Sequence, residues 1–244
     1  MNNTVIEETQ DTLVVEEEKI KDTEESVIVA ISYKLSFAQK VYRGIKTILD
    51  FFISLVGLIV LIPVFIIVGI AIKVDSKGPV FFAHKRIGKN GKEFYCIKFR
   101  SMTTDARHDV AGYEYAEVTS HITKVGKFIR KTSIDELPQL INVLCGKMSL
   151  IGYRPSQKSE KVLNDAREQY NMYQIKPGIT GWAQVNGRDD LAARPVEKAK
   201  YDAYYLKHYS FLLDIKILFK TIKQVLGKND VVEGVIERKN EEGK

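Results

Sequence analysis

An uninterrupted apolar segment dominates the first third of the chain. From Phe51 to Ile72 it runs for 22 residues without a charge, FFISLVGLIVLIPVFIIVGIAI. As a straight helix it would be roughly 33 Å long, and the hydrocarbon core of a bilayer is about 30 Å thick. A helix buried in a water-soluble domain is rarely apolar on every face over this length. The segment therefore predicts insertion into a membrane.

Pro63 lies in the middle of this segment, where it removes a backbone hydrogen bond and bends a helix. Basic residues flank both ends, and the positive-inside rule places both flanks on the cytosolic side. A re-entrant helix that dips into the membrane and returns satisfies both observations. Spanning helices also tolerate a proline, so a straight crossing stays open as the alternative. The flanking residues are Lys40, Arg43 and Lys46 before the segment, and Lys73, Lys77, Lys85 and Arg86 after it.

Two further stretches combine basic and apolar residues. Residues 33 to 49 precede the membrane segment, and residues 207 to 227 have lysines at helical spacing opposite apolar positions. The second stretch fits a helix packed on the domain core, or a basic amphipathic helix that lies on an anionic membrane. Its lysines are Lys216, Lys220 and Lys223, and the apolar positions are Leu212, Ile215, Leu218, Ile222 and Leu226.

The formal charge of +6 hides an uneven distribution. Residues 1 to 32 contain nine acidic side chains and two lysines, a net charge of −7, so the rest of the chain carries +13. We expect the acidic stretch to be a solvated, flexible tail. The basic remainder favours anionic partners. Two cysteines and no signal-peptide pattern indicate reduced thiols facing the cytosol, and the four histidines show no zinc-ligand spacing.

The soluble part begins with a predicted hairpin. Residues 80 to 100 form two β-rich runs joined through Asn90-Gly91, a strong short-range hairpin signal. Residues 111 to 123 are polar and predict a loop or a short helix. A helix over 135 to 145, stopped by Gly146, and a mainly helical segment over 195 to 227 follow. Between them, glycines and a proline in KPGITGWAQVNGR (176 to 188) indicate tight turns or close approach of backbone to a ligand.

Two adjacent carboxylates, Asp135 and Glu136, follow the basic run KVGKFIRK. Ser133 and Glu136 have the S-x-x-E spacing of a capping box, which is a structural role. With Ser133 as N-cap, however, Pro138 would fall inside the helical ladder, whereas Asp135 as N-cap would put the proline in the first turn. In either case the helix dipole and the nearby Arg130 should favour ionised carboxylates, and an ionised aspartate is a nucleophile toward phosphorus.

Several ordered motifs give the chain a specific resemblance to a known family. They are the hydrophobic segment with its central proline, GPVFFAHKRIGKNGKEFYCIKFRSM (78 to 102), KVGKFIRKTSIDELPQLINVLCGKMSLIGYRP (124 to 155) and KPGITGWAQVNGR. From about Tyr42 to Gly227 the chain resembles the bacterial sugar transferases of the monotopic phosphoglycosyl transferase superfamily, which begin cell-surface glycans on a polyprenol carrier. Three positions depart from the usual pattern of the family: Tyr153 in place of proline, Ile62 in place of serine, and His84 in place of glutamine.

The resemblance implies transfer of a sugar phosphate from a UDP-sugar to polyprenol (undecaprenyl) phosphate with release of UMP. It implies that Asp135 is the nucleophile that forms a covalent phosphosugar intermediate, and that Glu136 helps to hold Mg²⁺. The family's basic phosphate contacts fall on Lys98, Arg130 and Arg154, and a planar arginine fork suits phosphoryl transfer. We extend the predicted substrate-binding set to Arg86, Arg100, Pro155 and Arg188.

These observations predict an α+β fold: a mainly helical cytosolic domain with a small β-hairpin or sheet, anchored by a proline-broken re-entrant membrane helix and by interfacial amphipathic helices. Residues 1–32 would be the acidic tail, 33–73 the interfacial and re-entrant helices, and 74–244 the catalytic domain. The expected location is the cytoplasmic face of a bacterial plasma membrane, with membrane lipids as partners. The sequence names neither the sugar nor the pathway, and it leaves homo-oligomerisation open.

Three other readings make different predictions. A membrane-anchored scaffold with a basic surface would recruit anionic lipids or acidic partners and release no nucleotide. A nucleic-acid binder would need a recognition motif, and the sequence has no helix-turn-helix, zinc-finger or RNP signature, so we expect no nucleic acid partner. A CDP-alcohol phosphotransferase would carry an ordered D-x-x-D-G motif, whereas here only Asp189 and Asp190 are adjacent, without it.

Overall fold

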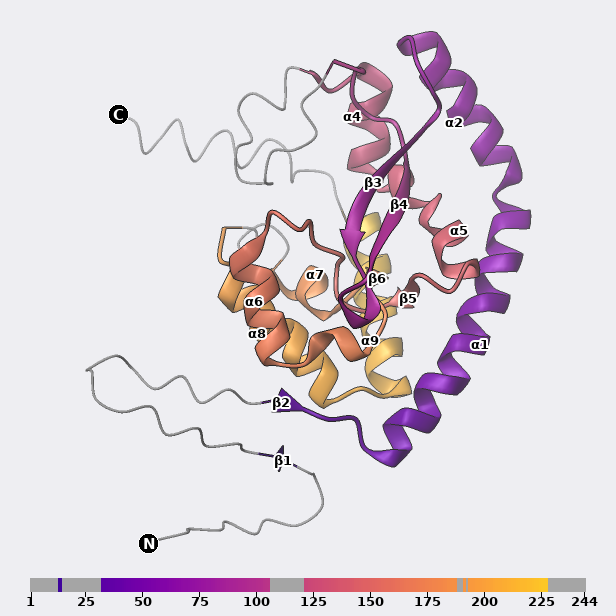
Figure 1. The fold of residues 1–244 in the computed structure, drawn as a ribbon. Coiled ribbons are helices and arrows are strands. Elements are labelled where there is room, and N and C mark those ends of the chain that lie inside the picture. The colour runs from indigo at the N-terminus through magenta and orange to yellow at the C-terminus, as the bar shows by residue number, and fades with distance from the viewer. Residues whose placement is uncertain (1–12, 15–31, 106–120, 188–190, 192, 228–244) are drawn as a thin grey trace, which may run out of the picture.

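The computed structural model describes residues 13–14, 32–105, 121–187, 191 and 193–227. The acidic tail apart from residues 13–14 and 32, most of the predicted loop at 111 to 123, and Arg188 lie outside this range. The described part is mainly helical with three two-stranded sheets, which confirms the α+β prediction. Two long helices, α1 and α2, form a curved arm along one side of the molecule (Figure 1).

The arm is a helix broken near its proline. Helix α1 (Phe37–Val60) begins at a capping box, in which Ser36 and Gln39 exchange backbone and side-chain hydrogen bonds. It ends at Leu61, and α2 (Ile62–Asp75) continues at an angle of 61°. Pro63 falls in the first turn of α2, where its missing N–H costs little. The predicted break is confirmed, and it lies two residues before the proline.

Much of the arm's apolar surface is uncovered. Among the described residues, neither α1 nor α2 alone has the length and apolarity to cross a membrane, whereas the bent pair taken together does. Exposed apolar side chains continue from the second half of α1 into α2, and a surface of this kind marks contact with lipid or protein. They include Ile48, Phe52, Val56, Ile59, Ile66, Ile67 and Ile70.

The predicted hairpin forms, with a longer connection than two residues. Strands β3 (Phe81–Ile87) and β4 (Glu93–Phe99) are antiparallel, and Ile87 pairs with Glu93, so five residues connect them. The connection contains the 3₁₀ turn η1 (Lys89–Gly91), in which Asn90 and Gly91 both have positive φ. Asn and Gly tolerate this conformation better than other residues, which explains the signal in the sequence.

Helix α2, the second half of the arm, packs beside the segment that carries Asp135 and Glu136, the carboxylate dyad. Val68 and Ile72 of α2 form a buried cluster with Phe99 of β4 and Ile129 of α4 (Lys124–Lys131). Ile134, the residue before Asp135, packs against this cluster. The arm therefore fixes the position of the dyad through direct apolar contacts.

The helix predicted over 135 to 145 is divided in two. A single 3₁₀ turn, η3 (Ile134–Glu136), is followed by α5 (Gln139–Leu144), and Gly146 with φ +69° ends the segment as predicted. Pro138 explains the division, because it has no N–H to donate to Ile134 and its ring would clash with that carbonyl. The prediction of one continuous helix was therefore wrong.

A parallel strand pair that the sequence did not predict joins the middle of the chain. Strands β5 (Ser149–Ile151) and β6 (Gly178–Thr180) are three residues each, too short for a clear alternating pattern. A Cβ at Gly178 would lie 2.0 Å from the backbone nitrogen of Gly152, so the glycine permits the close approach of the two chains. The remaining two-residue strands, β1 (Leu13–Val14) and β2 (Ser32–Tyr33), pair antiparallel.

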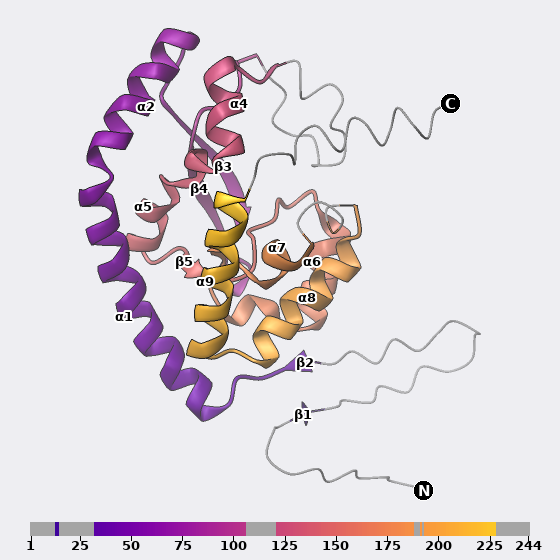
Figure 2. The same ribbon diagram turned by 180° about the vertical axis from the view of Figure 1, so that it is seen from behind.

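The last helices of the chain cluster beside the hairpin; all but the final one lie on its side away from α1 and α2, and the final one, α9, lies between them and α1 (Figures 1 and 2). Their largest buried core includes Tyr153, Tyr205 and Ile217. The elements are α6 (Lys161–Gln169), η4 (Met172–Gln174), α7 (Trp182–Gly187), α8 (Pro195–Lys207) and α9 (Phe211–Leu226). The helical prediction for 195 to 227 is confirmed, with a short interruption between α8 and α9.

Helix α9 packs on the core and still leaves an apolar face open. Leu213 and Ile217 are buried, whereas Leu212, Leu218 and Ile222 remain exposed. The ammonium groups of Lys216 and Lys220 lie 5.4 and 4.9 Å from the ring centre of Trp182. The prediction of a helix packed on the domain core is confirmed, and the exposed apolar residues leave contact with a membrane as a prediction.

Candidate active site

The dyad lies on a tight turn and not at a capped helix start. Ser133 adopts the left-handed conformation, with φ 58° and ψ 16°, and makes no side-chain cap bond. The backbone N–H of Glu136 donates to the Ser133 carbonyl at 3.2 Å. Both capping alternatives were therefore wrong, because neither Ser133 nor Asp135 caps the segment. The turn instead directs the two carboxylates into a cavity of about 1400 Å³.

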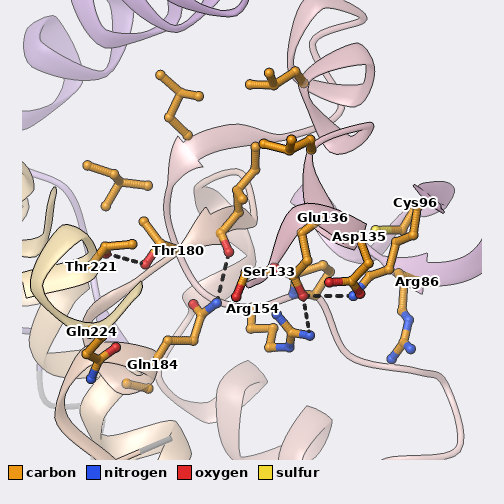
Figure 3. A pocket seen from close by; sticks show the side chains of 18 of the residues that line it. Arg86, Cys96, Ser133, Asp135, Glu136, Arg154, Thr180, Gln184, Thr221 and Gln224 are labelled. Atoms are coloured by element: carbon orange, nitrogen blue, oxygen red, sulfur yellow. Dashed lines mark hydrogen bonds and ion pairs between the residues drawn. The ribbon is translucent and has the colours of Figure 1, made fainter. Parts of the chain in front are cut away.

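Glu136 is held by two cations. Lys98 Nζ and Arg154 Nη2 each lie 2.8 Å from the same oxygen, Oε1. Burial opposes ionisation of Glu136, but the charges and hydrogen bonds of Arg154 and Lys98 outweigh it and hold the pKa of this carboxyl well below its usual range. Glu136 is therefore a fixed anion that joins β4 to the loop after β5 (Figure 3).

Asp135 differs from its neighbour. It is 8% exposed, and among the described residues its carboxylate has no hydrogen bond or ion pair. Burial raises its pKa, and the charges of Lys98 and Arg130 act in the opposite direction. The expectation that a helix dipole would favour the ionised form was wrong here, because a single 3₁₀ turn supplies almost no dipole. A desolvated carboxylate without partners retains its lone pairs for reaction.

The other predicted cations of the described part, Arg130, Arg86 and Arg100, all line the cavity. Arg130 lies in the last turn of α4, and Nη1 of Arg86, on β3, lies 3.5 Å from Oε1 of Glu160. Pro155 follows Arg154 on the same wall. Arg100 is 6% exposed and bonds carbonyls at the C-terminal end of α2, with Nη1 2.7 Å from Lys77 O and Nη2 2.7 Å from Ser76 O. These bonds leave less of Arg100 for a substrate.

The wall opposite the dyad contains polar residues that sequence reasoning missed. Thr180 and Thr221 share a hydrogen bond of 2.8 Å, and Gln184 donates to the Ile179 carbonyl at 2.9 Å. Gln224 lies beside them on α9 (Figure 3). The stretch at 176 to 188, whose glycines indicated tight turns or close approach to a ligand, supplies two of these residues, Thr180 and Gln184. Polar positions within apolar α9 were the remaining signal.

An apolar side of the cavity lies between the arm and α9. Leu49 and Ile53 of α1 and Ile215 and Leu218 of α9 line it. The cavity therefore joins a cationic, carboxylate-bearing side to an apolar side. This combination suits a ligand with a charged group and a hydrocarbon chain, together with a second, polar ligand.

The carboxylates offer limited coordination for a metal ion. Within the described ranges, no group of three or more His, Cys, Asp or Glu side chains could hold a metal. Both cations bond Oε1 of Glu136, which leaves Oε2 and the Asp135 carboxylate facing the cavity. Mg²⁺ is commonly held by one or two carboxylates together with substrate phosphates. The residues therefore fit Mg²⁺ that binds jointly with a diphosphate.

Characterised proteins with similar sequences act on the same class of lipid. The undecaprenyl-phosphate glucose phosphotransferase of Komagataeibacter xylinus is 43% identical over 191 residues, which cover 73% of this chain and 35% of the relative. The UDP-N-acetylgalactosamine-undecaprenyl-phosphate N-acetylgalactosaminephosphotransferase of Aeromonas hydrophila is 40% identical over 190 residues, 76% of this chain and 44% of the relative. The chain thus spans less than half the length of these two proteins.

A relative of similar size also matches. The exopolysaccharide production protein ExoY of Sinorhizobium fredii is 36% identical over 190 residues, which cover 72% of this chain and 83% of the relative. The family described as bacterial sugar transferase matches residues 41–228, a range that includes all of the arm but the first four residues of α1, together with the dyad and α9. On this match, and on the relatives that share it, the chain belongs to the bacterial sugar transferase family.

Proposed function

We propose that this protein transfers a sugar 1-phosphate from a UDP-sugar to undecaprenyl phosphate, with UMP and an undecaprenyl-diphospho-sugar as products. This would be the first membrane step of capsule, exopolysaccharide or glycoconjugate synthesis. The single observation that carries the proposal is the Asp135 carboxylate, which has no partner among the described residues, beside Glu136, which is fixed by Lys98 and Arg154 in the cavity. The names of the relatives, which include glucose and N-acetylgalactosamine phosphotransferases, support the reaction class.

In the first half of the reaction, an oxygen of Asp135 attacks the phosphorus that bears the sugar. A new P–O bond forms to the carboxylate, and the bond from that phosphorus to the bridging oxygen breaks. The electron pair stays on that oxygen, which leaves as part of UMP. Lys98, Arg130 and Arg154 surround the dyad with positive charge, which offsets charge on the oxygens of the transferred phosphoryl group.

In the second half, an oxygen of undecaprenyl phosphate attacks the same phosphorus. The bond to Asp135 breaks and restores its carboxylate, so no group is consumed on the enzyme. The acceptor phosphate is already ionised near neutral pH, so this step needs no general base. The unpaired state of Asp135 suits both halves, because a carboxylate tied to a cation would be a poorer nucleophile.

Glu136 Oε2 and the donor's diphosphate would hold Mg²⁺, which when bound neutralises phosphate charge. Glu136 itself orders the site, because it aligns Lys98 from the hairpin with Arg154 from the loop after β5. The two side chains come from distant parts of the sequence, and one oxygen brings them together. Their positive charges are thereby fixed before substrate binds, which reduces the reorganisation needed for reaction.

We place the protein on the cytoplasmic face of the bacterial plasma membrane, with the arm re-entrant in the inner leaflet. The uncovered apolar surface of α1 and α2 supports lipid contact, and the 61° bend supports a helix that enters and returns. Because α2 packs against Ile134, the dyad would lie close to the headgroup plane. A lipid phosphate and a cytosolic nucleotide could then reach the same carboxylate.

The experiment that tests this proposal combines membrane-bound protein, undecaprenyl phosphate and a panel of UDP-sugars, and it follows UMP release. A covalent intermediate should appear by mass spectrometry as one sugar-phosphate adduct per chain when the lipid is omitted, and it should be absent from Asp135→Asn. A scaffold would release no UMP with any sugar. Release that requires both substrates at once, without an adduct, would indicate direct transfer and overturn the covalent step.

A further inference from the structure

Lys198 is a cation of the cavity that the proposed chemistry has not used. It lies in the first turn of α8 and is half-buried, and its side chain lines the same cavity as Asp135 and Glu136. In the part of the chain that the structure describes, its ammonium group has no hydrogen bond and no ion pair. Nothing in the sequence distinguishes this residue, because Lys198 and Lys200 look alike in a mixed helical segment.

The charges around Lys198 are already paired with one another. Arg167 and Asp202 form a buried ion pair of 2.6 Å. Glu160 lies 3.5 Å from Arg86, and Arg154 bonds Glu136 at 2.8 Å. Each acidic group whose charge reaches Lys198 therefore has a cation of its own. Within the described ranges, the ammonium group of Lys198 is left as positive charge without a dedicated counterion.

This position is unfavourable for a cation. Burial lowers the pKa of Lys198 to about 8, and the neighbouring charge of Arg167 acts in the same direction. A lysine in the first turn of a helix also faces the positive end of the helix dipole. An anion bound in the cavity would compensate both effects, since it would supply the missing counterion.

We infer that Lys198 binds the phosphate group that leaves with the nucleoside. The inference rests on the proposed function, in which the donor brings two phosphates into one cavity. When the bridging P–O bond breaks, the electron pair moves to an oxygen of the leaving phosphate. The phosphate group thereby becomes more negative, from about −1 toward −2. An ammonium group at that oxygen stabilises the developing charge and so lowers the barrier.

Arg154 connects Lys198 to the dyad. Its guanidinium bonds Glu136, and its charge is close enough to lower the pKa of Lys198. The charge of Arg130 likewise lowers the pKa of Asp135, and we assign Arg130 to the phosphate that Asp135 attacks. Lys198 and Arg154 thus line the same cavity, and we assign Lys198 to the second phosphate of a diphosphate.

The position of α8 favours the nucleotide over the lipid phosphate as the ligand. Helix α8 and the α1–α2 arm lie on opposite sides of the β3–β4 hairpin in both views (Figures 1 and 2). A prenyl chain would approach from the uncovered apolar surface of the arm. A soluble nucleotide has access to the other side, where Lys198 lies.

The test compares Lys198→Met with Lys200→Met, which removes an exposed lysine two residues along the same helix. Full-length protein in detergent is titrated with UMP by calorimetry, and UMP inhibition of turnover is measured in parallel. We expect Lys198→Met to weaken UMP binding tenfold or more and to lower kcat, with the KM for undecaprenyl phosphate unchanged. Lys200→Met should match wild type, and Lys198→Arg should recover much of the UMP affinity.

Three results would overturn the inference or separate it from the proposed function. Wild-type UMP affinity in Lys198→Met would remove Lys198 from the nucleotide site. A raised KM for undecaprenyl phosphate with unchanged UMP affinity would assign the residue to the lipid phosphate instead. If wild-type protein turns over and Lys198→Met has the same kcat and UMP affinity as wild type, only this inference fails. Absence of both turnover and UMP binding in wild type would remove the proposed function. Thermal unfolding of each variant identifies any that fails to fold. If Lys198→Met does not fold, the UMP affinity of Lys198→Arg is the deciding measurement.

Discussion

Lys46 Nζ lies 2.6 Å from Oδ2 of Asp214, so a buried ion pair joins the arm helix α1 to α9. The hydroxyl groups of Tyr42 and Tyr205 donate to the same carboxylate at 2.6 and 2.7 Å. One turn further along α1, Asp50 accepts a hydrogen bond of 2.6 Å from Ser149 Oγ. These polar contacts fix the arm against β5 and α9, which form part of the cavity wall.

Removal of the Lys46 charge should therefore loosen the arm. Lys46→Met leaves two buried carboxylates without their cation, and breaking such a pair from one side typically costs about 3–5 kcal/mol. We expect a clear fall in the thermal unfolding midpoint of the protein in detergent. Lys40→Met is the matched control, because Lys40 is exposed on the same helix and its loss should change little. Equal midpoints for the two variants would show that the ion pair contributes nothing to stability.

Asp135→Asn should abolish UMP release while the protein remains folded and bound to membranes. An amide keeps the shape of the carboxylate but lacks the nucleophilic oxygen, and Asp135 has no ion pair to lose among the described residues. Turnover is measured together with the unfolding midpoint, which we expect to stay the same or rise, because burial disfavours the charged form. If more than a small fraction of wild-type UMP release survives, Asp135 is not the nucleophile.

The local features of the fold were predictable from the sequence, and the distant contacts were not. Pro63 predicted the break between α1 and α2, and Asn90-Gly91 predicted the hairpin, because each acts through its own backbone. The parallel pairing of β5 with β6 escaped notice because three-residue strands show no periodicity. The ion pair of Lys46 with Asp214 joins residues 168 positions apart, and no local pattern reports it.

The site was predictable in its residues and not in its electrostatics. Asp135, Glu136, Lys98 and Arg154 do come together, as the motifs implied. The predicted helix dipole would have favoured ionisation of both carboxylates alike, whereas among the described residues both cations bond Glu136 and neither bonds Asp135. Burial and partner choice cause this difference, and both depend on the tertiary arrangement of β4, η3 and the loop after β5.

The stability of the protein should fall at acid pH partly through Glu136. The folded-state pKa of Glu136 is depressed below the usual glutamate value of about 4.3. The contribution of Glu136 to the free energy of unfolding is therefore present above about pH 4.3, and it is lost as the pH falls from there toward the folded-state pKa. Glu136→Gln cannot titrate. We expect wild type to be more stable than this variant by a constant margin above about pH 5.5, and the margin to shrink below about pH 4.

Chemical unfolding of both proteins from pH 3 to 7 measures this margin directly. The titration of carboxylates distant from Glu136 is common to both and cancels in the difference, whereas the neighbouring Asp135, whose pKa the charge of Glu136 raises, contributes to it. A margin that does not change with pH would mean that Lys98 and Arg154 do not stabilise the ionised form of Glu136. In activity assays, Glu136→Gln should also be severely impaired, with an altered dependence on Mg²⁺. A wild-type rate that EDTA leaves unchanged would rule out the metal.

Arg154→Lys and Arg130→Lys retain the positive charge and lose the planar donor fork. We expect each change to lower kcat/KM by about tenfold or more, which corresponds to about 1.4 kcal/mol of transition-state stabilisation. Arg154→Lys should also weaken the contact with Glu136, because a single ammonium group takes the place of the guanidinium whose Nη2 lies 2.8 Å from Oε1 of Glu136. Lys127→Met, at an exposed position of α4, is the control for charge alone. Wild-type kinetics in both arginine variants would reduce these residues to solvated charges.

The re-entrant arrangement of the arm predicts that both of its ends face the cytosol. Lys40 lies near the start of α1 and Lys77 follows the end of α2, and both side chains are exposed. Lys40→Cys and Lys77→Cys, made separately in a chain lacking Cys96 and Cys145, place one thiol at each end. A membrane-impermeant thiol reagent should leave both unlabelled in intact cells and label both once the cells are opened. A straight crossing would export the basic start of α1, against the positive-inside bias, while the catalytic domain stayed in the cytosol. Labelling of Lys40→Cys in intact cells, with Lys77→Cys still protected, would establish that crossing and exclude the re-entrant arm.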